Sequence, residues 1–302
     1  MNWEKKGLIF NAIDLSDWQK HTALQPTPVI LEDRIRVFCG FRDGKGVSRV
    51  GYVDLDIENP EKVLGYSKNP ILDLGRPGSF DDNGVVPCSV VKRNSKLYMY
   101  YAGYNLGLTV RFKAFSGLAI SEDDGETFTR YQNNPVMERT NSEFLFRAIH
   151  SILKVDKHWK VWYGGGEKFI KGKDKTLPVY NIRYTESKDG VDFTQEGKVI
   201  IDIEDGMYRV GRPYVIKHEK FYQMFYGYSS EDCPYRLTYA SSEDGQTWKE
   251  DRGFVELNYG KGEFDEFMSA YPSVIYHNNK YYMFYNGNFY GREGFGLAIL
   301  KK

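Results

Sequence analysis

One unit recurs five times along the sequence, and this repetition limits the possible folds more than any other feature. The clearest copy is SFDDNGVVPCSVVKRNSKLYMYYAGY at residues 79–104, where paired acids and a Gly precede an apolar segment, a polar turn and an alternating aromatic segment. Its periodicity predicts a strand, a tight turn and a second strand. The anchor residues of the five copies lie 61, 63, 63 and 59 positions apart: Pro26, Pro87, His150, Pro213 and Pro272.

A second repeated piece follows three of the copies, as SGLAISEDDGETF, IRYTESKDGVDF and LTYASSEDGQTW. Each combines an alternating strand with an Asp-Gly pair and a final aromatic residue, which is Phe128, Phe193 or Trp248. Asp-Gly supplies the positive φ of a tight turn, and we expect the aromatic ring to fold back between neighbouring units. Four short strands in each of five units predict an all-β fold, a five-bladed β-propeller.

We expect residues 1–302 to form a single domain, because one repeat period runs through the whole chain and no low-complexity linker interrupts it. The blades are predicted to begin near residues 21, 82, 145, 208 and 267. The fifth copy reaches the C-terminus after only three predicted strands. The segment before the first copy is therefore expected to supply the missing strand and close the ring.

Charge and composition exclude some classes of function. The chain has 41 acidic and 41 basic residues and no basic tract, which argues against a protein that acts mainly on nucleic acid or on an anionic membrane. Aromatic residues make up 16% of the chain, with 24 Tyr. Tyrosine suits a sugar-binding surface because its ring stacks and its hydroxyl forms hydrogen bonds.

The cysteines indicate the redox environment in which the protein is expected to work. Cys39, Cys88 and Cys233 are odd in number and scattered, which is typical of a reducing environment. The N-terminal segment MNWEKKGLIFNAIDL has no apolar stretch long enough for a signal peptide or a membrane span. We therefore expect a cytoplasmic protein.

Charged side chains are predicted to gather at one mouth of the central channel. The first strand of each propeller blade lines the channel, and side chains at odd distances before each anchor should share one side of that strand. Because a buried charge is costly unless it is paired, such a cluster is either a salt-bridged plug or a polar active site. Its predicted members are His21, Gln25, Asp82, Glu143, Arg147, Arg212, Asp265 and Tyr271.

The loops between second and third strands should open on the same face of the propeller, and loops of this kind often carry function. They contain groups that hydrogen-bond hydroxyls, as a sugar site requires. The candidates from these loops are Arg42, Tyr104, Glu167, Asn288 and Arg292.

Several of these residues also have a plainer structural interpretation. Asp81 and Asp82 precede Asn83-Gly84 and are typical turn formers. Arg147 and Arg212 suit structural ion pairs as well as they suit a phosphate or a carboxylate. For His150 we favour a core histidine over a ligand-binding residue.

No cofactor is expected. The spacing of His and Cys residues does not indicate zinc, and a calcium ion in the channel stays open as an alternative.

Five segments also resemble a known group: SFDDNGVVPCSVV, YYAGYNLG, GLAISEDDGETF, YRVGRPYVIK and YYMFYNGNFYGREGFGLAIL. They are similar to the glycosidase-like five-bladed propellers, the group around glycoside hydrolase families 43, 32, 68 and 130. The resemblance covers essentially the whole chain. It is strongest to a sucrase-like branch that tends to accompany bacterial surface-polysaccharide genes.

The resemblance implies roles for particular residues. Those families place acids at the start of blade one, in blade two and in blade three, so Asp82 or Asp81 and then Glu143 would be catalytic. Blade one departs from the pattern, since His21 and Gln25 stand where an acid is expected. A phosphorylase-type branch needs only one protein carboxylate, because phosphate is its nucleophile and is held by basic residues. The arginines suited to that role are Arg147, Arg209 and Arg212.

The leading hypothesis is a carbohydrate-active enzyme, glycoside hydrolase-like, that cleaves or transfers at a glycosidic or glycosyl-phosphate bond in surface-polysaccharide metabolism. Its partner would be a carbohydrate or a sugar phosphate, and not nucleic acid or membrane. Two alternatives stay open. One is a glycosyltransferase or phosphorylase that uses an anionic sugar donor, and the other is a catalytically inactive propeller that binds a glycan or a protein.

Overall fold

The computed structural model describes residues 1–204, 206–251, 257 and 260–301, which form five blades of four antiparallel strands and one short helix, α1 (Asn288–Gly291). Blades one and two are β2 (His21–Ile30), β3 (Arg34–Arg42), β4 (Ser48–Asp56), β5 (Val63–Tyr66), then β6 (Val85–Arg93), β7 (Lys96–Leu106), β8 (Phe112–Ser121), β9 (Thr129–Arg130). Blades three and four are β10 (Phe146–Val155), β11 (His158–Lys171), β12 (Thr176–Ser187), β13 (Lys198–Ile201), then β14 (Met207–Lys217), β15 (Tyr222–Ser230), β16 (Arg236–Ser242), β17 (Lys249–Asp251). Blade five is β18 (Ala270–His277), β19 (Lys280–Asn286), β20 (Gly294–Leu300) and β1 (Trp3–Asn11).

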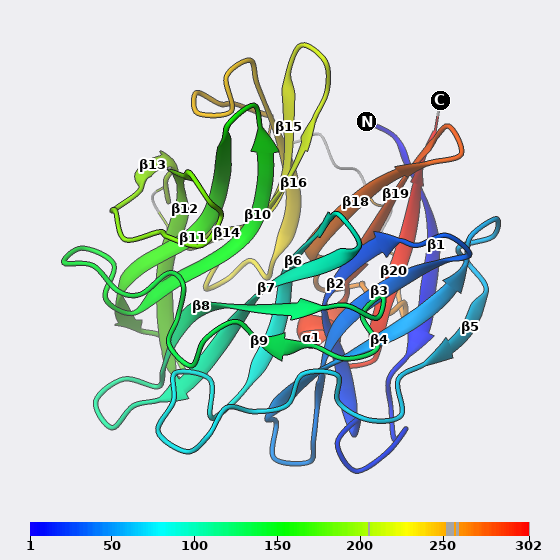
Figure 1. Cartoon of the computed structure of the whole chain (residues 1–302), viewed down its shortest axis with the longest axis horizontal. Helices are drawn as coiled ribbons and strands as arrows, with labels where there is room; N and C mark the ends of the chain where they lie inside the picture. Colours follow the sequence, from blue (N-terminus) through cyan, green and yellow to red (C-terminus); the bar gives the residue numbers. More distant parts are fainter. Residues whose placement is uncertain (205, 252–256, 258–259, 302) are drawn as a thin grey trace.

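The first strands of the five blades surround a common axis (Figure 1). Each contacts the first strands of two neighbours, in the cyclic order β2, β6, β10, β14, β18 and back to β2. Parallel bridges also connect blade two to blade three and blade three to blade four. The all-β, five-bladed propeller predicted from the repeat is the observed fold.

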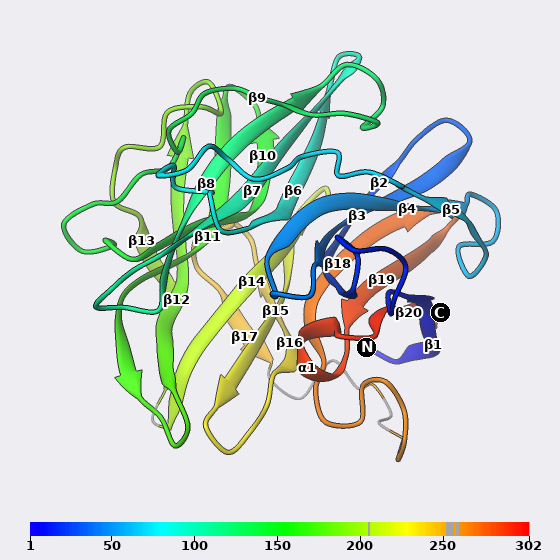
Figure 2. The same ribbon diagram turned by 90° about the horizontal axis from the view of Figure 1, so that it is seen from below.

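The two ends of the chain share the last blade. β1 pairs antiparallel with β20 from Trp3 opposite Leu300 to Asn11 opposite Gly294. Figures 1 and 2 show the N-terminal strand in blue beside the C-terminal strand in red. The ring is therefore closed by hydrogen bonds between the first and last strands of the chain.

Every first strand contains a β-bulge near its anchor residue, and the bulges correct the sequence-based frame. In blade two the extra residue lies between Pro87 and Ser89, so Cys88 is the structural equivalent of His150. The anchor of blade two is therefore Cys88, one position after the predicted Pro87. Two blades, and not one, lack proline at the bulge.

The apolar core is divided into five layers, each between two neighbouring blades. The predicted return of the turn aromatics into these layers is confirmed. The ring of Phe128 packs edge-on against Phe38 of the preceding blade with centroids 5.5 Å apart, and Trp248 meets Trp162 of the preceding blade at 6.5 Å. The Asp-Gly turns therefore join one blade to the next.

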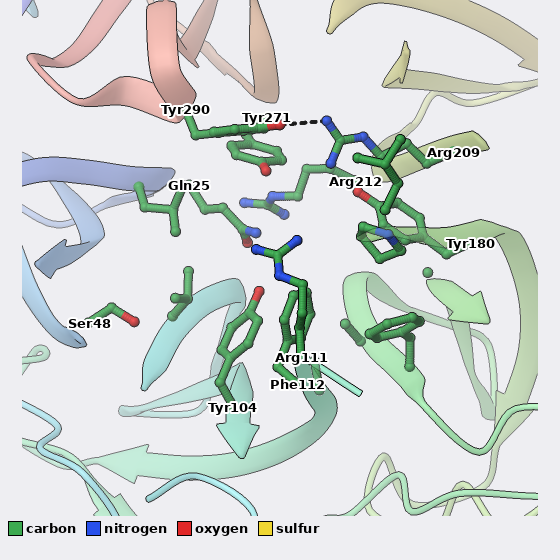
Figure 3. Close-up of a pocket in the computed structure, with 18 of the residues that line it drawn as sticks. Gln25, Ser48, Tyr104, Arg111, Phe112, Tyr180, Arg209, Arg212, Tyr271 and Tyr290 are labelled. Carbon is green, nitrogen blue, oxygen red and sulfur yellow. Dashed lines mark hydrogen bonds between the residues drawn. The ribbon is translucent and has the colours of Figure 1, made fainter. Parts of the chain in front are cut away.

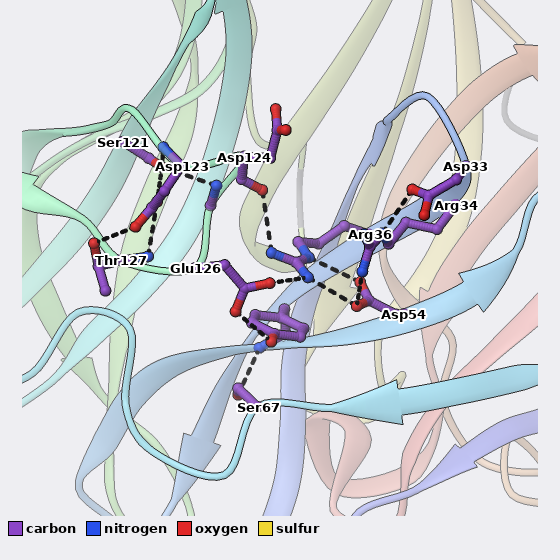
Figure 4. Close-up of polar contacts among 12 residues, drawn as sticks. Asp33, Arg34, Arg36, Asp54, Ser67, Ser121, Asp123, Asp124, Glu126 and Thr127 are labelled. Atoms are coloured by element: carbon purple, nitrogen blue, oxygen red, sulfur yellow. Dashed lines mark hydrogen bonds and ion pairs between the residues drawn. The ribbon is translucent and has the colours of Figure 1, made fainter.

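A buried arginine strengthens the joint between blades one and two (Figure 4). Arg36, 1% exposed, donates to both carboxylate oxygens of Asp54 at 2.8 Å and to Glu126 at 2.6 Å. It also donates to the carbonyl of Asp124, inside the Asp-Gly turn of blade two, at 3.1 Å. Its guanidinium carbon lies 3.6 Å from the ring centre of Tyr52. The charge is thus paired within blade one, by Asp54, and across the joint, by Glu126 of blade two.

No helix in the described ranges is long and apolar enough to cross a membrane.

Arg36→Met is expected to lower the free energy of unfolding by about 3 kcal/mol or more, because it leaves the buried carboxylate of Asp54 without its main partner. Arg34→Met is the matched control. The Arg34 side chain is 36% exposed, and its loss should cost less than about 1 kcal/mol. Urea denaturation measures both values, and equal losses would contradict the assignment.

Asp244 should give the fold an acid-sensitive contribution. Although burial opposes ionisation, hydrogen bonds from Thr247, Gln246 and Ser242 hold the pKa of the Asp244 carboxyl at about 2, below its usual 3.8. A depressed folded-state pKa stabilises the protein above pH 3.8, and this stabilisation is lost as the pH falls toward about 2.

The difference in unfolding free energy between the wild type and Asp244→Asn should therefore shrink over that interval. Glu243→Gln removes an exposed neighbouring charge that is not among the hydrogen-bond partners of Asp244, and it serves as the control. A difference that does not change with pH would contradict the assignment.

Candidate anion- and sugar-binding site

A pocket of about 390 Å³ opens at the centre of the propeller. Its walls come from the first strands and from the loops between second and third strands (Figure 3). The lining is rich in arginine and tyrosine: Gln25, Arg42, Ser48, Asn83, Tyr104, Arg111, Phe112, His150, Lys175, Tyr180, Tyr208, Arg209, Arg212, Tyr235, Tyr271 and Tyr290 contribute to it.

The charged side chains that line this pocket, among the described residues, are all basic. Among the described residues that line it, none is Asp or Glu. Five are basic: Arg42, Arg111, Lys175, Arg209 and Arg212. In Figure 3 the side chains of Arg111 and Arg212 point toward the middle of the cavity from different blades. Converging cations without an acid attract an anion.

Arg212 of blade four forms the centre of the pocket floor and contacts all four of the other blades. It is 2% exposed, and its guanidinium donates to the carbonyl oxygens of Cys88 at 2.6 Å and His150 at 3.3 Å. It also donates to the hydroxyls of Thr27 at 3.1 Å and Ser273 at 3.5 Å. All four acceptors are neutral, its Nε has no partner in the described structure, and burial lowers its pKa. Arg212 is thus a buried charge for which no described side chain acts as a counter-ion.

The backbone turns these inner residues toward the channel. Gln25, Arg212 and Tyr271 each precede the anchor proline of their blade, and each has a positive φ of 54°, 56° or 58°. A left-handed conformation at a residue other than Gly costs about 1 to 3 kcal/mol and persists only where the surroundings enforce it. The three residues line the pocket together, so the strain coincides with the candidate site.

Arg209 is held on the pocket wall by aromatic residues. A parallel bridge between β12 and β14 sets Tyr180 beside Arg209. The guanidinium carbon lies 4.3 Å from the ring centre of Tyr235, and Nη2 donates to the hydroxyl of Tyr290 at 2.6 Å. Nε donates to Ser229 at 2.8 Å, so these hydrogen bonds of a 7% exposed arginine reach only neutral groups.

A strained turn supplies Tyr290. Phe289 and Tyr290 are consecutive residues with positive φ, 52° and 61°, inside α1. The side chain of Asn288 fastens this turn, since its carbonyl oxygen accepts from the backbone N–H groups of Phe267 and Met268. Asn288, a predicted sugar-binding residue, thus positions the tyrosine and does not line the pocket.

Six of the predicted site residues line the pocket: Gln25, Arg42, Tyr104, Arg209, Arg212 and Tyr271. The other candidates do not. Glu167 is exposed on β11 and Arg292 is exposed on the loop before β20, and His21 lies half-buried with its Nδ1 2.7 Å from the Thr22 hydroxyl. Arg147 is fully buried and binds the carbonyls of Glu138, Phe193 and Gln195.

The predicted acids lie elsewhere, because each precedes the first strand of its blade by three to five residues and so falls outside that strand. Asp81, Glu143 and Asp265 are in the loops that enter these strands, and all three are 0% exposed. Each accepts a hydrogen bond from a tyrosine 20 positions further on, at 2.9, 2.6 and 2.8 Å, respectively: Tyr101, Tyr163 and Tyr285.

Each of these acids also has a basic partner. Asp81 pairs with Arg130 at 2.8 Å, Glu143 pairs with Arg147 at 3.0 Å, and Asp265 pairs with Lys5 at 3.0 Å. An acid, a tyrosine and a base therefore form a repeated clamp that fastens the entry loop to its blade. The constant spacing of 20 residues to a tyrosine is the sequence signal that would have revealed the clamp.

Asp82 is half-buried in the same entry loop of blade two. Its carboxylate accepts from the side-chain amide of Asn105 at 3.0 Å and from the backbone N–H of Gly78 at 2.9 Å. Its neighbour Asn83 lines the central pocket, whereas Asp82 does not. The structure therefore separates the three predicted catalytic acids from the arginines that line the pocket.

Sequence reasoning missed Tyr180, Tyr208 and Tyr235 of the aromatic wall and Lys175 of the basic rim. The insertion in blade three lengthens β11 and β12 into a hairpin that carries Lys175 and Tyr180 to the pocket. Arg111 reaches across to this hairpin and donates to the carbonyl of Thr176 at 2.8 Å. In the sequence, the length of the blade-three insertion was the one feature that indicated a contribution of this hairpin to the pocket.

The described residues contain no cluster of three or more His, Cys, Asp or Glu side chains that could hold a metal ion.

Glu143→Gln should destabilise the protein without weakening the pocket. The change removes a buried carboxylate from Arg147, which should cost about 3 kcal/mol in unfolding free energy. Anion affinity of the folded variant, measured by calorimetry, should equal that of the wild type. A variant that keeps its stability but loses its ligand would instead place Glu143 in the site.

Comparison with known proteins agrees with this fold. The family model described as "Glycosyl hydrolases family 32 N-terminal domain" matches residues 66–183. The uncharacterized protein Rv1502 of Mycobacterium tuberculosis (strain ATCC 25618 / H37Rv) is 34% identical over 303 residues, covering 100% of both chains.

Two solved structures superpose over nearly the whole chain. The BT0996 RGII complex has a TM-score of 0.73 at 20% identity, and the match covers 98% of this chain and 91% of the other. A thermostable family-43 glycoside hydrolase has a TM-score of 0.67 at 18% identity, with coverage of 92% and 88%. The chain therefore belongs to the family of Rv1502, and it is a glycoside hydrolase-like five-bladed propeller.

Proposed function

We propose that this propeller is a carbohydrate-active protein whose central pocket binds an anionic sugar, with the phosphate or carboxylate group held by Arg209 and Arg212. One observation carries the proposal. Both arginines line the pocket and are more than nine-tenths buried, yet their hydrogen bonds reach only neutral groups. A buried charge is stable only when it is compensated, so an anionic ligand would supply the missing counter-charge.

The rest of the lining suits a sugar. Tyr104, Tyr180 and Tyr271 present rings and hydroxyls to the cavity, and Gln25 adds an amide (Figure 3). Aromatic rings stack on the apolar faces of sugars, while hydroxyl and amide groups hydrogen-bond their edges. The pocket volume falls in the range of small-molecule sites.

Among anionic sugars, a glycosyl phosphate fits the chemistry best. Glycosidases typically use a pair of Asp or Glu residues beside the scissile bond, and the described lining offers neither. A phosphate leaves as an anion, and arginine stabilises the charge that develops on it. Cleavage or transfer at a glycosyl-phosphate bond therefore places less demand on a protein carboxylate than hydrolysis of a neutral glycoside.

A role in surface-polysaccharide metabolism and a cytoplasmic location stay predictions from the sequence. A glycosyl-phosphate site is compatible with the first of these, because activated sugars are the donors of glycan assembly.

Calorimetry with hexose 1-phosphates, glucuronate, inorganic phosphate and neutral hexoses tests the proposal. The anionic sugars should bind, and the neutral sugars should bind at least tenfold more weakly, because a hydrogen bond to a charged group contributes about 1.5 to 3 kcal/mol. The phosphate and carboxylate arms distinguish the two possible anions.

Arg111→Gln should weaken the binding of the anionic sugars about tenfold, because the side chain points into the pocket. Lys113→Gln is the matched control, since Lys113 lies two residues further along, in a separate polar groove. Equal affinity for neutral and anionic sugars would refute the proposal, and an Arg111 variant that binds like the control would exclude Arg111 from the anion site.

A further inference from the structure

His150 lines the pocket, and its side chain forms no hydrogen bond with the described residues of the propeller framework. It occupies the bulge of β10, where blades one, four and five carry a proline and blade two carries Cys88. Only its backbone takes part in the hub, because its carbonyl accepts from Arg212. The imidazole is therefore an addition to the repeat, and the fold of the other blades does not require it.

The imidazole is buried, and one of its nitrogens lacks a partner. His150 is 8% exposed, and its Nδ1 has no hydrogen bond within the described structure. Burial, and then the charge of Arg212, lower the pKa of His150 well below its usual value. The ring is therefore neutral at physiological pH, with one nitrogen protonated and the other an acceptor. Because Nδ1 is buried, Nε2 is the nitrogen that a ligand can reach, and Nε2 accepts a hydrogen bond in the tautomer that carries the proton on Nδ1.

The neighbouring residues leave the ring accessible from the pocket. Ala148 and Gly164 face each other across β10 and β11, and both line the cavity beside His150. A Cβ added at Gly164 would lie 3.5 Å from Nε2 of His150. The absence of a side chain at Gly164 thus exposes this edge of the imidazole to a ligand.

His150 also differs in kind from the rest of the lining. Among the described lining residues it is the only histidine, and no carboxylate accompanies it. The arginines, Lys175 and the tyrosine hydroxyls can all donate hydrogen bonds. A sugar hydroxyl that must donate a hydrogen bond therefore finds its strongest neutral acceptor at the imidazole.

We propose that His150 contacts the ligand directly, accepting a hydrogen bond from a sugar hydroxyl next to the anionic group that Arg212 holds. This inference rests on the proposed function, and it identifies the ligand as an anion that carries a hydroxylated ring. Inorganic phosphate alone would occupy the arginines and leave His150 without a partner.

The test compares the affinities of inorganic phosphate and of a panel of hexose 1-phosphates for the wild type and for His150→Phe and His150→Ala. Loss of one neutral hydrogen bond should weaken hexose 1-phosphate binding about three- to tenfold and leave phosphate binding unchanged. The Phe variant keeps the ring volume, and the Ala variant covers the case in which Phe does not fit the bulge. His218→Phe, which removes a histidine outside the pocket, should bind both ligands like the wild type.

The outcomes separate this inference from the proposed function. If the wild type binds no phosphate and no hexose 1-phosphate, the proposed function fails and the inference fails with it. If the wild type binds both, and the His150 variants weaken both equally or neither, the inference alone is overturned. Wild-type protein that binds hexose 1-phosphates no more tightly than phosphate overturns it as well.

Discussion

The buried guanidinium of Arg212 is the interaction on which the centre of this molecule depends. It extends from blade four and donates hydrogen bonds to groups of the other four blades, so the five first strands share one side chain. Its acceptors are neutral, and the charge stays uncompensated at the floor of an open pocket. Stability of the ring and the proposed affinity for an anion would therefore have the same physical origin.

The surrounding structure keeps acids away from that charge. Asp81, Glu143 and Asp265 are each bound to a tyrosine and a basic residue inside the entry loops. This arrangement satisfies three buried carboxylates locally, and it leaves the channel mouth to arginine and tyrosine. The fold is shared with glycoside hydrolases, whereas the chemistry of the pocket is set by side chains that the fold does not dictate.

The sequence was sufficient for the fold because repetition, strand periodicity and Asp-Gly turns act locally. It was less informative about the site. The positions of Gln25, Arg212 and Tyr271 within the repeat were enough to place them in the channel. Arg147 and Asp265 have similar positions in their repeats, but they form ion pairs with Glu143 and Lys5 outside the pocket. Which neighbours each side chain contacts depends on β-bulges, on residues with a positive φ and on loops such as the β11–β12 hairpin. Short-range patterns do not reveal these features.

A crystal structure with a hexose 1-phosphate bound tests the central claim most directly. The account predicts a phosphate within hydrogen-bond distance of the Arg212 guanidinium, with the sugar ring among the pocket tyrosines. A sugar bound instead beside Asp82 and Asn105, with the arginines still uncompensated, would contradict the account and restore a carboxylate-centred site.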